Sequence, residues 1–373
     1  MKDRWIKLNL RKLVCSILIL SLPISVFADQ IKRLPSGKPD FSGVYDTGTM
    51  TLEERPGVLG ELESIYPWVA DLLTWAIESF QASNNADSDP NREAPPKGGV
   101  GGWENSFGGG NTGGYNSFYA DMFSYHSVID GKIRTSIIYE PENGKRPPAV
   151  PGAMRKMGDI YASFIHENTG TATWLEKEGA GPFDGPETLA PSERCLISFA
   201  STVPTLPSLY NNYKRIVQTD DHIMILQEMV HDARVIRIDS EHSASANKKW
   251  LGDSIAYWEG EKLIVETKNF KNISGLGGSD ENLHVIERFS YDQDGQLLYD
   301  FTVNDATVWT APWSGIYVWN RRDDSKVYEY ACHEGNYAMG NVLRGARLLE
   351  REWREKEALI NEETLEVSAG GSG

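Results

Sequence analysis

The chain has 373 residues, a formal net charge of −16 and a 10% share of aromatic residues. Nucleic-acid backbones and anionic bilayers repel such an acidic protein, so we expect neither a nucleic-acid partner nor an anionic membrane surface as a partner. The chain is too long for one small barrel, which predicts additions to a single core or a second subdomain.

Residues 1–28 are typical of a signal peptide. Five basic residues precede an apolar run over 13–27, which is short for a membrane span, and Val26-Phe27-Ala28 form a cleavage site before Asp29. An uncleaved N-terminal anchor is the alternative. We therefore expect a periplasmic or secreted protein without stable membrane insertion after cleavage, and cleavage would change the formal charge from −16 to −20.

The region 29–151 combines several kinds of segment. Residues 40–45 have the pattern of a first strand, and the three-four apolar spacing over 61–81 predicts a helix with Pro67 in its first turn. This helix is expected to pack on the core, because its polar face lacks the basic residues of a membrane-surface helix; a lid is the other alternative. The Gly-rich run 84–114 predicts a loop or flap, and Asp130-Gly131 predicts a hairpin joining 115–128 to 132–139.

The region 152–342 carries the core sheet. A mostly helical stretch over 152–178 and a loop over 179–195 lead into a long meander, in which apolar residues recur at every second position. The expected strands lie within 214–219, 222–230, 232–239, 254–260, 261–270, 281–292 and 296–305. Two further strands are expected, one before and one after a turn at Asp323-Asp324. The region 343–373 predicts a solvated helix and a frayed tail.

The fold class that follows is mainly β. Such a long antiparallel meander needs its edges closed or covered, so we expect a closed barrel or a strongly curled sheet with peripheral helices.

Two cysteines, Cys195 and Cys332, remain after the predicted cleavage. In an oxidising compartment they are expected to form one disulfide that ties the middle of the chain to the end of the last strand. The alternative is a reactive or metal-binding thiol at Cys332, because His333 and Glu334 follow it directly.

One motif is close to a zinc signature. Residues Gln227 to His231 match the HExxH pattern with its first histidine replaced, but the surrounding pattern predicts a strand, which would place Glu228 and His231 on opposite faces. We therefore reject a zinc-protease site and expect no metal or cofactor.

Polar residues at strand ends are the candidates for chemistry. His231 and Asp232 would act in acid/base catalysis, and Arg234 would hold a carboxylate or a carbonyl at the mouth of the barrel. A second cluster joins His333 and Glu334 with His284 and Glu287; if the two clusters met inside the barrel, an acid/base site or a His/carboxylate metal site would result. Ordinary salt bridges at the rim are the alternative for each residue.

Aromatic residues are the candidates for holding a ligand. Tyr210, Trp258 and Tyr299 fall on or beside strands, and Asp253 directly precedes the strand that contains Trp258. We predict that these four residues and Arg234 bind a flat apolar ligand, with packing of the sheet as the alternative for each aromatic ring.

Several segments together resemble a family of exported bacterial β-rich proteins. They are IVQT, EMVHDARVI, WLGDSIAYWEG with EKLIVETKNF, ENLHVIERF and YEYACHEGN, preceded by PDFSGVY and RTSIIYEP. The strand pattern is similar to that of lipocalins, whose first strand often carries Gly-x-Trp where this chain has Gly43-Val44-Tyr45. The resemblance implies export and a shared fold, and it implies no functional residue.

Three functions are compatible with these observations. The first is an exported barrel that binds an apolar or aromatic small molecule. The second is an isomerase, lyase or hydrolase that uses the same pocket for proton transfer on a lipid-, terpenoid- or polyketide-like substrate. The third is an envelope protein that acts through a protein partner, for which an exposed aromatic patch is expected.

Overall fold

The computed structural model describes residues 31–84, 119, 123, 125–166, 169–273 and 276–370. The predicted signal peptide and almost all of the predicted Gly-rich loop lie outside these residues.

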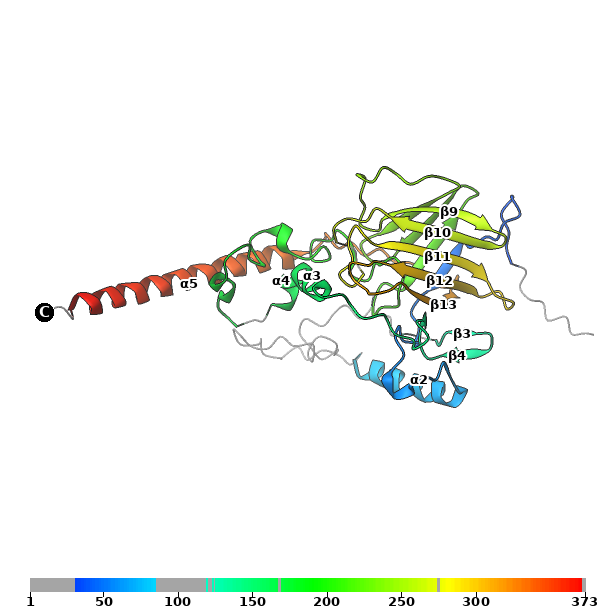
Figure 1. Ribbon diagram of the computed structural model, residues 1–373, viewed down its shortest axis with the longest axis horizontal. Helices are drawn as coiled ribbons and strands as arrows, with labels where there is room; N and C mark the ends of the chain where they lie inside the picture. The colour runs from blue at the N-terminus through cyan, green and yellow to red at the C-terminus, as the bar shows by residue number, and fades with distance from the viewer. Residues whose placement is uncertain are drawn as a thin grey trace, which may run out of the picture.

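Nine strands form a closed, mostly antiparallel barrel (Figure 1). The ring closes because β1 pairs with β6 on one side and with β13 on the other, while β5 (Ile138–Glu140) adds to β13. The predicted mainly β fold with a closed meander and peripheral helices is therefore confirmed. The barrel strands are β1 (Gly43–Asp46), β6 (Tyr213–Gln218), β7 (His222–Gln227), β8 (Ala233–Ile238), β9 (Asp253–Glu259), β10 (Lys262–Lys268), β11 (His284–Tyr291), β12 (Leu297–Asn304) and β13 (Trp313–Arg321).

One neighbouring pair breaks the antiparallel pattern. Strands β8 and β9 run parallel, with Ile236 opposite Ser254, so residues 239–252 must return along the outside of the barrel before β9 begins. The crossover brings the start of β9 to the end of the barrel at which β7 stops and β8 starts. We call this end the upper mouth.

Aromatic side chains fill the barrel. Tyr299 and Trp319 lie fully buried with ring centroids 4.8 Å apart, and Phe289 contacts both rings. A loop from the upper mouth completes the packing: the backbone N–H of Thr205 donates to the Tyr299 hydroxyl, and the Tyr317 hydroxyl donates to the Thr205 carbonyl. Side chains and this loop thus occupy the middle of the barrel.

A small second sheet and one helix lie beside the barrel (Figure 1). The sheet contains β2 (Ser64–Ile65), β4 (Lys132–Arg134) and β3 (Val128–Ile129). The predicted turn at Asp130-Gly131 joins β3 to β4, and both of its residues have positive φ, as a tight hairpin turn requires.

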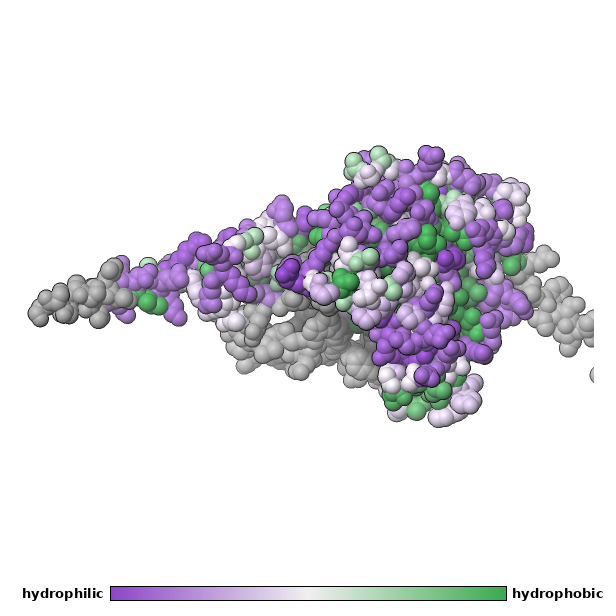
Figure 2. Space-filling view, in the orientation of Figure 1, coloured by the Kyte–Doolittle hydropathy of each residue, from purple (hydrophilic) through white to green (hydrophobic). Residues whose placement is uncertain are grey.

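The helix α2 (Pro67–Asn84) begins at the predicted proline but packs less closely than expected. Ala70 is buried, and the Thr74 hydroxyl reaches the sulfur of Met50 and the ring of His126. Trp68 and Trp75, by contrast, are 67% and 65% exposed, and hydrophobic residues gather over this helix in Figure 2. Only a narrow stripe of the predicted apolar face is used in packing.

The helices that follow β5 in the chain lie on the side of the upper mouth (Figure 1). The longest, α5 (Tyr337–Gly370), begins before the region 343–373 in which a helix was predicted, and Glu350 on it accepts a hydrogen bond from the indole of Trp174 at 3.1 Å. Among the described helices, none is long and apolar enough to cross a bilayer. The other helical segments are η1 (Gly57–Leu59), α3 (Ala153–Ile160), α4 (Ala162–Ile165), η4 (Thr173–Glu176) and η5 (Pro186–Thr188).

The prediction of a strand after the turn at Asp323-Asp324 is wrong. Residues 325–332 form no strand, and Tyr330 makes a single bridge to Met229. Pairing with β1 already closes the edge of β13, so this segment finds no free edge and instead runs to the upper mouth.

Candidate functional site

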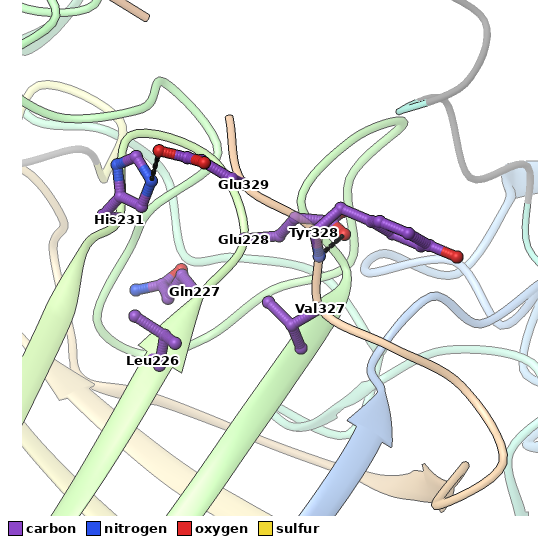
Figure 3. A pocket seen from close by; sticks show the side chains of 7 residues that line it. All are labelled: Leu226, Gln227, Glu228, His231, Val327, Tyr328 and Glu329. Carbon is purple, nitrogen blue, oxygen red and sulfur yellow. Dashed lines mark hydrogen bonds and ion pairs between the residues drawn. The ribbon is translucent and has the colours of Figure 1, made fainter. Parts of the chain in front are cut away.

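A pocket of about 310 Å³ opens at the upper mouth, where β7 ends and the segment after β13 passes it (Figure 3). One wall comes from the end of β7 and the turn that follows, and the other comes from three consecutive residues of the passing segment. The lining residues are Leu226, Gln227, Glu228, His231, Val327, Tyr328 and Glu329.

The turn between β7 and β8 shapes one wall of the pocket. The N–H of Gln227 donates to the carbonyl of Asp232 at 2.8 Å, which draws the two strand ends together. Val230 and His231 both have positive φ, 62° and 54°. Positive φ is unfavourable for a β-branched residue such as Val230, so the turn stores backbone strain next to the pocket.

Glu228 is the most deeply buried charged residue of the pocket. Its side chain is 6% exposed, and one carboxylate oxygen accepts the backbone N–H of Tyr328 at 2.9 Å (Figure 3). Burial raises the pKa of Glu228 above its ordinary value, although this hydrogen bond and the charge of Lys214 act in the opposite direction. Within the described residues, Glu228 forms no ion pair.

His231 and Glu329 face each other across the rim of the pocket. The imidazole Nε2 lies 3.8 Å from a carboxylate oxygen of Glu329 (Figure 3), and both side chains are more than half exposed. Solvent weakens an exposed pair of this kind, so its contribution to stability is small. The predicted catalytic residue His231 therefore lies in the pocket, and its ring remains accessible.

Asp232 lies behind the pocket wall. Its carboxylate accepts the Ser201 hydroxyl at 2.5 Å and the backbone N–H of Ser198 at 3.1 Å, which fastens the loop 198–201 to the turn. Burial raises the pKa of Asp232, and these hydrogen bonds lower it in part. Its predicted catalytic role stays a prediction.

Tyrosine rings gather beside the pocket. Tyr119 and Tyr330 meet edge to face with centroids 4.8 Å apart, and the Tyr119 hydroxyl donates to the backbone carbonyl of Glu329. Tyr210, a predicted ligand residue, packs edge to face on Phe199 at 5.7 Å and is 6% exposed. These rings support the wall that carries Tyr328 and Glu329.

Arg234 and Tyr299 lie inside the barrel, below the pocket. The guanidinium of Arg234 donates two hydrogen bonds, 2.7 and 2.8 Å long, to the two carboxylate oxygens of Glu287, and the Tyr299 hydroxyl donates to the same carboxylate. All three side chains are at most 4% exposed. The contacts of Arg234 thus belong to a buried ion pair, and its predicted hold on a ligand stays a prediction.

Asp253 lies at the start of β9 and is fully buried. Its carboxylate accepts hydrogen bonds from Arg237, Lys249 and the Ser243 backbone at 2.9 to 3.0 Å, and His242 lies 3.2 Å away. These donors hold the pKa of Asp253 far below its ordinary range despite burial. The cluster fastens the crossover 239–252 to β9.

Trp258 lies near the opposite mouth of the barrel, where its ring stacks on Phe41 with centroids 5.9 Å apart. The structure therefore places the predicted ligand residues Trp258 and Asp253 apart from the pocket residues, and their binding role stays a prediction.

The second predicted cluster is dispersed. His284 pairs with Glu266 on the outer face of the barrel, while Glu287 points inside. His333 and Glu334 are exposed in the turn after Cys332. Among the described residues, no group of three or more His, Cys, Asp or Glu side chains is arranged to hold a metal ion.

The predicted disulfide between Cys195 and Cys332 is confirmed. The alternative of a free reactive or metal-binding thiol at Cys332 is therefore wrong. The bridge links the loop 179–195 to the segment that carries Val327, Tyr328 and Glu329. Cys332 lies two residues beyond Tyr330 on this segment.

Sequence reasoning missed most of the pocket. It assigned no role to Glu228, because strand alternation placed its side chain opposite His231, but β7 ends at Gln227 and the turn brings both residues to one cavity. A consecutive Gln-Glu pair at the end of an apolar strand was the available signal. Tyr328 and Glu329 carried no signal, since the segment was expected to be a strand.

Together, the fold and this site define a closed nine-stranded β-barrel protein with a small, polar-rimmed pocket at one mouth. No model of a known protein family matches the chain, and no curated protein matches it. The resemblance to exported bacterial β-rich proteins therefore remains a prediction beyond the barrel fold itself.

Proposed function

We propose that the protein is an exported β-barrel that binds a small, mainly apolar or aromatic molecule. The pocket at the upper mouth carries this proposal, because its volume of about 310 Å³ lies in the range of small-molecule sites. Leu226, Val327 and Tyr328 supply apolar surface for the body of the ligand. Glu228 and His231 supply the polar groups that would orient it.

Export is supported by the disulfide. A bond between Cys195 and Cys332 persists in an oxidising compartment such as the periplasm or the extracellular space. We accordingly propose a periplasmic or secreted protein whose partner is a small molecule.

A second candidate is an acid/base enzyme that uses the same pocket. A buried carboxyl group with a raised pKa, Glu228, lines one cavity with an accessible imidazole, His231, and such pairs serve as proton donor and acceptor in catalysis. The reaction would be an isomerisation, elimination or hydrolysis of a lipid-, terpenoid- or polyketide-like substrate.

Native mass spectrometry of the protein isolated from the periplasm of its host tests the first proposal. We expect an added mass that corresponds to an organic molecule. An empty protein that also fails to bind any member of a library of apolar and aromatic compounds would overturn binding as the function.

The variant His231→Ala separates the two candidates. A binding protein should keep most of its affinity for the ligand, whereas an enzyme that loses its general base should lose turnover by about 10²- to 10⁴-fold with little change in binding. His222→Ala is the matched control, because the side chains of His222 and His231 are both 52% exposed and His222 lies outside the pocket.

A further inference from the structure

We infer that the pocket at the upper mouth selects a ligand with a positive charge, such as a substituted ammonium ion attached to an apolar or aromatic body. The inference rests on the proposed binding function and names the chemistry of the ligand. Its basis is a buried carboxylate, Glu228, that lines the pocket and forms no ion pair with any described residue.

Glu228 differs in this respect from the other deeply buried glutamates of the barrel and its attached helix. Glu287 is paired with Arg234, and Glu350 on α5 is paired with Arg347. Glu228, at 6% exposure, receives one backbone hydrogen bond, from Tyr328, and no ion pair from any described residue. A buried carboxylate is costly without a counter-charge, and a cation in the adjacent pocket would supply it.

The rest of the pocket also favours a cation. A second carboxylate, Glu329, stands at the rim, and none of the seven lining residues is a lysine or an arginine. The buried Lys214 acts on Glu228 through its charge, and its amine donates to the Asn211 carbonyl. The pocket lining thus carries two carboxylates and no lysine or arginine of its own.

Aromatic rings add a second attraction. Tyr328 lines the pocket, and Tyr119 and Tyr330 pack next to it. The face of a tyrosine ring attracts ammonium groups, so tyrosines near the pocket favour a substituted ammonium over a neutral or anionic group. The chain's net charge of −16 would also draw cations toward the protein.

The test compares three probes that share one phenyl ring: benzyltrimethylammonium, benzyl alcohol and benzoate. Binding to the whole protein is measured by isothermal titration calorimetry, with backbone NMR shifts at Tyr328 and Glu329 to locate the bound probe. We expect the cation to bind at least tenfold more tightly than the alcohol, and benzoate to bind most weakly.

Two variants test whether Glu228 causes the preference for the cation. Glu228→Gln keeps the acceptor for the Tyr328 N–H and removes the charge, so the affinity for benzyltrimethylammonium should fall roughly tenfold while that for benzyl alcohol is unchanged. Glu355→Gln, an exposed site on α5, is the matched control and should have no effect. Circular dichroism of each variant checks that the fold is retained.

The outcomes keep the two proposals apart. If benzyl alcohol or benzoate binds in the pocket as tightly as the cation, or if Glu228→Gln binds the cation like the unaltered protein, the charge selectivity is overturned while the binding function stands. If no probe shifts the pocket resonances and the natively isolated protein is empty, both proposals fail.

Discussion

Arg234, which was predicted to bind a ligand, forms a buried ion pair with Glu287 that stabilises the fold. Their doubly hydrogen-bonded pair is at most 4% exposed, so removing one partner leaves the other charge buried and alone. We expect Arg234→Met to lower the free energy of unfolding by about 3–5 kcal/mol, measured by urea denaturation.

The double variant Arg234→Met/Glu287→Met is the control for this prediction. It removes both charges together, so its stability should lie much closer to that of the unaltered protein than the single variant does. If the double variant is destabilised by the sum of the two single effects, Arg234 and Glu287 contribute to stability independently and their ion pair is not the cause.

Asp253 should make stability depend on pH. Its pKa is lower in the folded chain than in the unfolded chain, so the stabilisation is present above the ordinary pKa of an aspartate, near 4, and is lost as the pH falls through the folded value. We expect Asp253→Asn to lose about 3 kcal/mol at pH 7 and progressively less below pH 4. Thermal unfolding across this pH range measures the difference, and a gap independent of pH would contradict the assignment.

At this scale, the sequence predicted a role for His231 but for none of the other residues that line the pocket. Histidine at a strand end is a visible signal, because the residue type itself suggests proton transfer. Glu228 was hidden by the alternation rule, which fails here because the strand expected over 222–230 ends at Gln227. The partners of Arg234 and Asp253 were also out of reach, since Glu287 and Arg237 are distant in sequence and only the closed ring makes them neighbours.

At the scale of elements, the turn between β7 and β8 carries strain that a single substitution should relieve. Val230 has a φ of 62°, a conformation that asparagine adopts more readily than a β-branched residue. We expect Val230→Asn to raise the free energy of unfolding by about 1 kcal/mol, seen as a higher melting temperature.

Val235→Asn is the control for the turn. Val235 is an exposed residue on β8, where asparagine is a poorer strand former, so this variant should be neutral or slightly destabilised. Equal effects at both sites would mean that the left-handed backbone of Val230 is not the source of any gain.

Period-two patterns predicted the individual strands well, because each strand buries alternate residues inside the barrel. The exceptions have physical causes. The segment after Asp323-Asp324 has a strand-like composition, but β1 already occupies the edge of β13. The helix α2 has the expected period and has Pro67 in its first turn, yet most of its described apolar residues are not buried, which no periodicity can reveal.

At the scale of the whole molecule, the disulfide joins two parts of the chain separated by 137 residues. Constraining a loop of that length reduces the entropy of the unfolded chain, so Cys195→Ser/Cys332→Ser should lose roughly 2–5 kcal/mol of stability in chemical denaturation. The segment bearing Tyr328 and Glu329 should also loosen, and ligand affinity should fall with it.

The control for the bridge is the unaltered protein after treatment with a reductant, which should unfold like the double variant. Two thiols that react freely in the oxidised native protein would contradict the bridge altogether.

Closure of the barrel was predictable, because a long open meander would leave two exposed edge strands. The filling of the barrel was not. The loop around Thr205 enters the ring and hydrogen-bonds to Tyr299 and Tyr317. Sequence alone suggested a binding cavity among the aromatic residues, whereas the described cavity lies above them at the mouth.

The number of strands has a consequence for the crossover. Strands that alternate in direction around a closed ring must be even in number, so a ring of nine leaves one pair of neighbours running the same way. That parity defect lies between β8 and β9. It obliges the chain to travel back outside the ring over 239–252, and it explains why so many donors converge on Asp253. A closed barrel with an even number of strands could be antiparallel throughout. The crossover over 239–252 would then be unnecessary, and Asp253 would have no crossover to hold.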